Sequence, residues 1–234
     1  MDSFLPYGKQ WIDEEDIQSV IEVLKSNFIT QGPKVELFEK KICAYTGADF
    51  CVVVSHGTAA LHIAVAALEL SGNLEGITSP ITFSASANCM IYNRIKPVFA
   101  DIDKKSYLID FDALRTKLNN KVKLIIPVHF AGQPVNMKLL YQTTRENNIH
   151  IIEDAAHALG SCYKDGSKVG NCRYSDMTIF SFHPVKPITT GEGGAITTNN
   201  RALYEKLVTL RTSFAGSVMA CRFEPSALTN QILA

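Results

Sequence analysis

The chain contains 234 residues, 46% of them hydrophobic, and is therefore long and apolar enough to bury a sizeable core. Its 23 basic and 23 acidic side chains give a formal net charge of zero, without a basic run that would follow nucleic acid or an anionic membrane. No apolar run approaches the roughly 18 residues of a transmembrane helix, and the N-terminus lacks the basic and apolar segments of a signal peptide. These features argue against nucleic-acid and membrane binding and predict a cytoplasmic protein.

The six cysteines are scattered, and none belongs to a C-x-x-C pair. Several stand in apolar, strand-like contexts, such as Cys51 in FCVVVS, where a cysteine is usually a small core residue. The spacing therefore predicts neither a metal site nor a disulfide framework.

Residues 13–26 form the first predicted helix, because Ile17, Val20, Ile21 and Leu24 fall on one face and acidic residues occupy the first turn. Similar patterns predict helices at 34–46, 55–70, 84–92, 110–119 and 136–147. Short apolar or β-branched runs predict strands at 50–54, 77–80, 95–100, 122–128, 149–152, 177–182 and 195–198.

This alternation predicts an α/β fold with a mainly parallel sheet and helices on both faces. No internal repeat or low-complexity linker divides the chain, so residues 1–212 are predicted to form one large domain and residues 213–234 a divergent tail. Ligands of such sheets bind at the carboxyl ends of the strands, and the motifs that follow fall at positions of that kind.

Residues 176–198, DMTIFSFHPVKPITTGEGGAITT, contain the main catalytic candidate. A predicted strand delivers Ser181 and then Lys186, which stands between Pro184 and Pro187. The prolines stiffen the loop, and a desolvated lysine there has a lowered pKa and a neutral amine able to form a Schiff base. A solvated loop lysine is the alternative, since most lysines are exposed.

Two further motifs follow predicted strands. Ser55-His56-Gly57-Thr58 opens a helix, where free N–H groups, close approach at Gly57 and the Thr58 hydroxyl suit an anion; an ordinary helix cap is the alternative. Asp154 can pair with a protonated ring nitrogen of a cofactor, or cap the next turn. Its neighbour Glu153 is expected to face the opposite side of the strand, and His157 is either a polar neighbour or part of the site.

Phe83 follows the strand predicted at 77–80 and can stack on an aromatic cofactor ring, although a single phenylalanine is more often a core residue. His129, at the end of another strand, is expected to be structural or to line the pocket wall. A dinucleotide fingerprint, G-x-G-x-x-G, is excluded for residues 191–196, because Ile196 stands where its third glycine is required and because the segment precedes a strand rather than a helix. An anion site, an aromatic ring, a strand-end carboxylate and a lysine together match the needs of pyridoxal 5′-phosphate.

With these motifs the chain resembles the DegT/DnrJ/EryC1/StrS family of sugar-nucleotide aminotransferases over about residues 5 to 212. The matching segments are 30–33 (TQGP), 55–61 (SHGTAAL), 81–83 (ITF), 87–88 (AN), 97–102 (PVFADI), 153–157 (EDAAH), 181–183 (SFH), Lys186 and the GEGG turn. The resemblance implies the aspartate-aminotransferase-like fold, known as fold type I. The SFHPVKPITT segment is most similar to the branch of the family that supplies pseudaminic acid.

The resemblance also implies roles for individual residues. Lys186 forms the Schiff base with pyridoxal phosphate and moves the proton, and Asp154 holds the ring nitrogen. The remaining cofactor-binding residues are Gly57, Thr58 and Ser181 at the phosphate, Phe83 on the ring, and His157 near the 3-hydroxyl. The expected reaction transfers an amino group from L-glutamate to a 4-keto sugar nucleotide, in a homodimer. Relatives with histidine in place of Lys186 are dehydratases, so the lysine favours transamination.

The chain leaves the family pattern after about Thr212, and the small second domain of the family is not matched. We therefore expect a chain truncated relative to the family. Two hypotheses remain open from the sequence: an aminotransferase, or a folded remnant that binds the cofactor or a partner without turnover.

Overall fold

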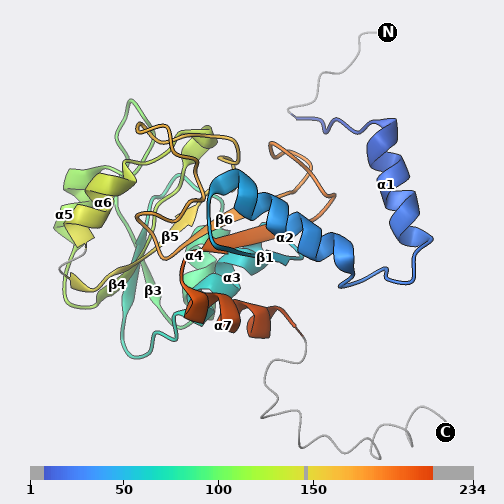
Figure 1. The fold of residues 1–234 in the computed structure, drawn as a ribbon. Coiled ribbons are helices and arrows are strands. Elements are labelled where there is room, and N and C mark those ends of the chain that lie inside the picture. Colours follow the sequence, from blue (N-terminus) through green and yellow to red (C-terminus); the bar gives the residue numbers. More distant parts are fainter. Residues whose placement is uncertain (1–7, 145–146, 213–234) are drawn as a thin grey trace, which may run out of the picture.

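The computed structural model describes residues 8–144 and 147–212. Within these ranges, seven strands form one mixed sheet in the order β1-β7-β6-β5-β4-β2-β3 (Figure 1). The strands are β1 (Phe50–Val54), β2 (Glu75–Thr78), β3 (Lys96–Phe99), β4 (Val122–Ile126), β5 (His150–Asp154), β6 (Met177–Ser181) and β7 (Gly194–Thr198). The helices are α1 (Glu14–Leu24), α2 (Pro33–Thr46), α3 (Gly57–Ala67), α4 (Ala85–Tyr92), α5 (Phe111–Lys117), α6 (Met137–Thr144) and α7 (Arg201–Arg211), with a 3₁₀ turn η1 (Phe130–Gly132).

The expected tail at 213–234, which includes Cys221, lies outside the described residues. Residues 1–7, the start of the N-terminus that lacks the features of a signal peptide, also lie outside them.

The sheet is parallel from β3 through β6, which confirms the predicted α/β class. The exception is β7, which is antiparallel to both β6 and β1. A loop without a crossover helix joins β6 to β7, so the chain reverses direction there. Because β7 is antiparallel to both neighbours, β1 and β6 run in the same direction. Their carboxyl ends therefore lie at the same edge of the sheet, on either side of β7.

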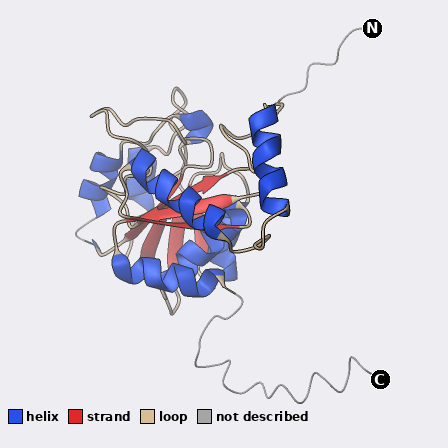
Figure 2. Ribbon diagram, turned by 45° about the vertical axis from the view of Figure 1, so that its right-hand side comes forward, coloured by secondary structure: helices blue, strands red, loops and turns tan. Residues whose placement is uncertain are grey.

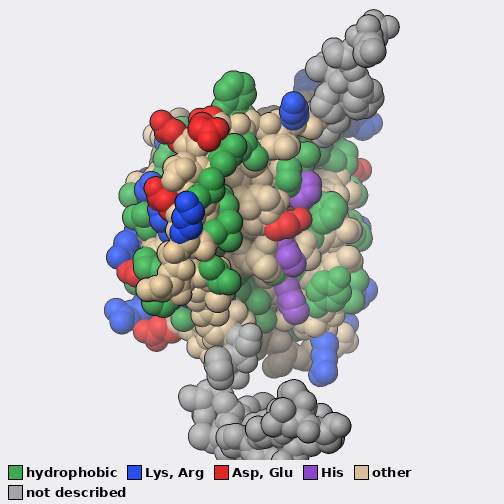
Figure 3. Space-filling view, turned by 90° about the vertical axis from the view of Figure 1, so that its right-hand side faces the viewer, with side chains coloured by type: hydrophobic (Ala, Val, Ile, Leu, Met, Phe, Trp, Pro, Cys, Tyr) green, Lys and Arg blue, Asp and Glu red, His purple; other side chains and the backbone are tan. Residues whose placement is uncertain are grey.

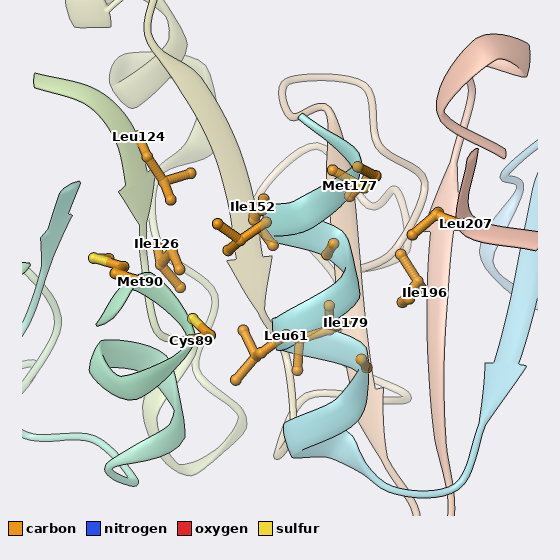
Figure 4. Packing of buried hydrophobic residues seen from close by; sticks show 14 of the residues in the cluster. Leu61, Cys89, Met90, Leu124, Ile126, Ile152, Met177, Ile179, Ile196 and Leu207 are labelled. Carbon is orange, nitrogen blue, oxygen red and sulfur yellow. The ribbon is translucent and has the colours of Figure 1, made fainter. Parts of the chain in front are cut away.

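Helices cover both faces of the sheet, as predicted (Figure 2). One face packs against α3, α4 and α7; its core includes Leu61, Ile152, Ile179 and Leu207 (Figure 4). The opposite face is covered by α2, α5 and α6, whose buried side chains extend two further clusters. Burying each large aliphatic side chain contributes about 1.5–3 kcal/mol. No helix in the described ranges is both long and apolar enough to cross a bilayer.

Local signals explain most helix ends. Asp13 and Asp16 form a capping box at the start of α1, and Gly47, at φ 84°, ends α2 in the left-handed conformation that glycine tolerates. Asp110 caps α5 through the N–H of Ala113 at 2.7 Å. The structure differs from the sequence prediction at α7, a helix that was not predicted.

The apolar face predicted for α1 is present but exposed. None of its residues is buried, and Val20 and Leu24 are 59% and 67% exposed. The helix lies to one side of the sheet and its covering helices (Figure 1). This face is therefore unpartnered within the described part of the chain.

Candidate active site

A cavity of about 670 Å³ opens at the carboxyl edge of the sheet. Its walls come from the segments that follow β1, β2, β4, β5 and β6. Every predicted site residue lines it, namely Gly57, Thr58, Phe83, Asp154, His157, Ser181 and Lys186. The fold thus brings together residues more than a hundred positions apart, because parallel strands place their carboxyl ends side by side. Which role each residue has remains a prediction.

The turn between β1 and α3 presents the N-terminus of a helix to the cavity. His56 is the N-cap residue, and its Nδ1 accepts a hydrogen bond from the N–H of Ala59 at 2.9 Å. The N–H groups of Gly57 and Thr58 also belong to the first turn of α3, where backbone N–H groups have no carbonyl partner within the helix. A Cβ at Gly57 would lie 2.9 Å from Cβ of Ser181, so only glycine lets the turn approach β6 this closely. This close packing sets the helix N-terminus beside the Ser181 hydroxyl.

Lys186 lies in the loop between β6 and β7. Its N–H donates to the carbonyl of His183 at 2.9 Å, and Thr189 Oγ1 donates to the carbonyl of Phe182 at 2.9 Å, which ties the loop back to the strand. Lys186 is partly buried, and this desolvation lowers the pKa of its ammonium group, while the negative charge of Asp154 acts in the opposite direction. The site therefore favours a neutral amine more than a solvated loop does.

Asp154 ends β5 and is only 5% exposed. Its backbone is fixed on both sides, since its N–H donates to the carbonyl of Pro127 and its carbonyl accepts from the N–H of His129. The side chain accepts a hydrogen bond from Ser86 Oγ at Oδ2 (2.6 Å) and one from the N–H of Ala156 at Oδ1 (3.2 Å). A buried carboxylate held in this way presents a fixed negative charge to the cavity.

Glu153 points away from Asp154, as expected from the alternation of a strand, and is buried. Its Oε2 accepts hydrogen bonds from His129 Nε2 (2.7 Å) and Tyr163 (2.5 Å), and its Oε1 from Ser175 (2.5 Å) and Thr178 (2.9 Å). Burial opposes ionisation, but these donors, His129 foremost, outweigh it and lower the pKa of Glu153.

His129 therefore holds a structural position in the cavity wall. Its Nδ1 accepts the N–H of Val135 at 3.2 Å, which leaves the proton on Nε2 and directs it to Glu153.

Phe83 and His157 lie at the mouth of the cavity. Phe83 is 74% exposed, so one face of its ring is free to stack on a planar ligand. The pKa of His157 is lowered, first by the burial of part of its ring and then by the positive charge of Lys186, while Asp154 opposes both effects. His157 is therefore biased towards the neutral form, which can both donate and accept a hydrogen bond.

Sequence reasoning missed several cavity residues. The space-filling view has a column of histidine side chains with an acidic side chain among them (Figure 3). Besides His157, the cavity lining includes His56, His183 and Glu192. Each of these residues belongs to a segment singled out from the sequence. Their position next to a predicted site residue or motif could have identified them as cavity residues. Ser86, which is buried behind the cavity lining and contacts Asp154, was also missed.

The comparisons with known proteins show the family of this chain. A family model described as the DegT/DnrJ/EryC1/StrS aminotransferase family matches residues 10–223. The UDP-4-amino-4,6-dideoxy-N-acetyl-β-L-altrosamine transaminase of Campylobacter jejuni is 41% identical over 211 residues, which cover 89% of this chain and 55% of that protein. The chain spans about half the length of the curated relatives it matches.

Solved structures agree with this assignment. Helicobacter pylori PseC, described as an aminotransferase in the biosynthesis of pseudoaminic acid, superposes with a TM-score of 0.84 at 37% identity, covering 88% of this chain and 55% of PseC. The pyridoxal-phosphate form of the sugar aminotransferase Spr1654 from Streptococcus pneumoniae gives a TM-score of 0.81 at 33% identity, covering 87% of this chain and 57% of that one. These similarities confirm the predicted fold type I.

Proposed function

The chain belongs to the DegT/DnrJ/EryC1/StrS aminotransferase family, and we propose that it binds pyridoxal 5′-phosphate and transfers an amino group from L-glutamate to a 4-keto-6-deoxy sugar nucleotide. The observation that carries the proposal is the meeting of Lys186, Asp154, Phe83 and Ser181 in one cavity. The descriptions of PseC and of the Campylobacter transaminase support a role in making amino sugars of the pseudaminic acid type. The name of a Bacillus subtilis relative that is 41% identical, spore coat polysaccharide biosynthesis protein SpsC, supports their use in cell-surface polysaccharides.

The residues fit the cofactor on geometric and chemical grounds. The helix N-terminus at Gly57 and Thr58, beside the Ser181 hydroxyl, offers hydrogen-bond donors for a phosphate, and the exposed ring of Phe83 offers a stacking surface. Asp154 supplies a buried carboxylate for a protonated ring nitrogen. Together with the amine of Lys186 in the same cavity, these make up the four kinds of group that the cofactor needs.

When bound, pyridoxal phosphate supplies an aldehyde for amines and a ring that takes up the electrons of a broken C–H bond. Lys186 Nζ, biased towards its neutral form, would hold the cofactor, and as a free amine it would move the proton between the α-carbon of the amino donor and the cofactor. Asp154 would hold the protonated ring nitrogen, and His157 would lie at the 3-hydroxyl side. Phe83 would cover one face of the ring and exclude water from it.

Two further parts of the proposal concern assembly and location. The exposed apolar face of α1 supports a homodimer in which the two copies cover this face. The five cysteines of the described ranges are free, as is usual in the reducing cytoplasm, where we place the protein. Recovery of a tagged chain in a membrane or extracytoplasmic fraction would contradict the location.

The transfer reaction itself gives the test. The chain, loaded with pyridoxal phosphate, is incubated with nitrogen-labelled L-glutamate and a panel of 4-keto-6-deoxy sugar nucleotides. Mass spectrometry of the nucleotide is expected to show the label, and Lys186→Ala is expected to abolish it. Cofactor binding without label in any sugar would instead support the second hypothesis, a folded chain that binds the cofactor without turnover.

A further inference from the structure

Two hydroxyl groups, those of Ser86 and Thr82, form a chain of hydrogen bonds that ends on the carboxylate of Asp154. Ser86 Oγ lies 2.6 Å from Asp154 Oδ2 and also 2.6 Å from Thr82 Oγ1. Ser86 is fully buried in the first turn of α4, and Thr82 lines the cavity next to Phe83. The three groups therefore connect the segment that carries Phe83 to the carboxylate at the end of β5.

The directions of these hydrogen bonds follow from the chemistry of the groups. A hydroxyl has one proton to donate, and an ionised carboxylate is a stronger acceptor than a neutral oxygen. Ser86 therefore donates to Asp154, and Thr82 donates to Ser86. The carbonyl of Phe83, at 3.3 Å from Ser86 Oγ, is the weaker competing acceptor.

No other side chain within the described ranges donates to the Asp154 carboxylate. The second hydrogen bond comes from the backbone N–H of Ala156, at the longer distance of 3.2 Å. The nearby thiol of Cys89 is fully buried, and its burial together with the charge of Asp154 raises its pKa to about 12, so it stays neutral. The orientation of Asp154 thus depends on Ser86 more than on any other group.

We propose that Ser86 is a positioning residue: its hydrogen bond occupies Oδ2 of Asp154 and turns Oδ1 towards the ring nitrogen of the cofactor, with Thr82 holding the Ser86 hydroxyl. The inference rests on the proposed function, since it assumes that Asp154 meets that nitrogen. Without Ser86 the carboxylate loses a charge-assisted hydrogen bond and its fixed orientation, and the contact with a protonated ring weakens.

The test compares two ligands that form no covalent bond with Lys186. One is pyridoxamine phosphate; the other is its analogue in which carbon replaces the ring nitrogen. We expect Ser86→Ala to weaken binding of pyridoxamine phosphate by about tenfold, as the loss of a hydrogen bond to a charged group does, and to leave the analogue unchanged. Thr82→Val should also weaken binding of pyridoxamine phosphate, but by less. Ser86→Thr, which keeps the hydroxyl, should bind pyridoxamine phosphate as the unaltered chain does.

Ser84→Ala is the matched control, because Ser84 is exposed at the start of the same helix and makes no side-chain cap. Equal losses for both ligands would show a merely structural role, and unchanged binding of pyridoxamine phosphate in Ser86→Ala would also overturn the inference. If the unaltered chain binds neither ligand, the proposed function fails, and the inference fails with it.

Discussion

The chemistry of the site depends on the charge state of Lys186. Because burial lowers the pKa of its ammonium group below the ordinary 10.5, the neutral amine should predominate from a lower pH than in a solvated lysine. Asp154→Asn removes the charge that raises this pKa, so the midpoint should fall further. The pH dependence of Lys186 acetylation, followed by mass spectrometry, measures both.

Asp112→Asn is the control, since that carboxylate is exposed and lies outside the cavity lining. A midpoint at or above 10.5 for Lys186, or an upward shift in Asp154→Asn, would contradict the burial argument.

The phosphate site that we propose depends on the absence of a side chain at Gly57. In Gly57→Ala, the new Cβ would lie 2.9 Å from Cβ of Ser181 and push the helix N-terminus away from β6. We expect pyridoxamine phosphate to bind about tenfold more weakly, in line with the cost of overpacking, while pyridoxamine without phosphate is unaffected. Calorimetric titration with both ligands makes the comparison, and a similar loss for both would place the damage outside the phosphate site.

At the scale of the elements, the Glu153 hydrogen bonds join β5, β6 and the segments that carry His129 and Tyr163. Glu153→Gln puts an NH₂ group among hydroxyl donors and should lower the free energy of unfolding by about 2–4 kcal/mol. Urea denaturation measures this, with Glu205→Gln as a control that removes only an exposed pair with Arg201, worth less than about 1 kcal/mol.

This contribution should also depend on pH. The folded protein holds the pKa of Glu153 below its ordinary value of 4.5, so the stabilisation is complete above the pKa of the unfolded chain. It should be lost as the pH falls through the lower pKa of the folded state. The loss of unfolding free energy caused by Glu153→Gln should therefore be largest at neutral pH and should shrink in acid. A loss that stays constant with pH would contradict the assignment.

Most elements could be predicted from the sequence because their signals are local. The β-branched run of β1, the first-turn acids of α1 and Gly47 after α2 each act within a few residues. The reversed direction of β7 could not be predicted in this way, because it is fixed by pairing with β1 and β6, far apart in the sequence. The helix α7 was missed, although Leu203 and Leu207 have helical spacing.

The same distinction applies to the site. Lys186 and Asp154 could be predicted because Asp154 ends a strand and Lys186 lies in the loop that follows one, both in distinctive segments. The partnership of Ser86 with Asp154 joins residues 68 positions apart, and it depends on β2 and β5 having their carboxyl ends at one edge. Only the sheet order brings such groups together.

At the scale of the whole molecule, the exposed apolar face of α1 predicts self-association. Trp11 and Ile29, which flank the helix in the sequence, are also exposed, at 87% and 73%. We expect a dimer in size-exclusion chromatography with light scattering. Val20→Glu should shift it towards monomer, while Gln18→Glu, the same charge at a polar position of α1, should not. A well-behaved monomer at all concentrations would contradict the proposal.

The central claim is that the folded chain holds pyridoxal phosphate on Lys186. The direct measurement is to incubate the chain with the cofactor, reduce it with borohydride and map the modified peptide by mass spectrometry. The account predicts an adduct on Lys186 that disappears in Lys186→Ala and persists in Lys34→Ala, a change at an exposed lysine. A folded chain with no adduct, or with the adduct on another lysine, would contradict it.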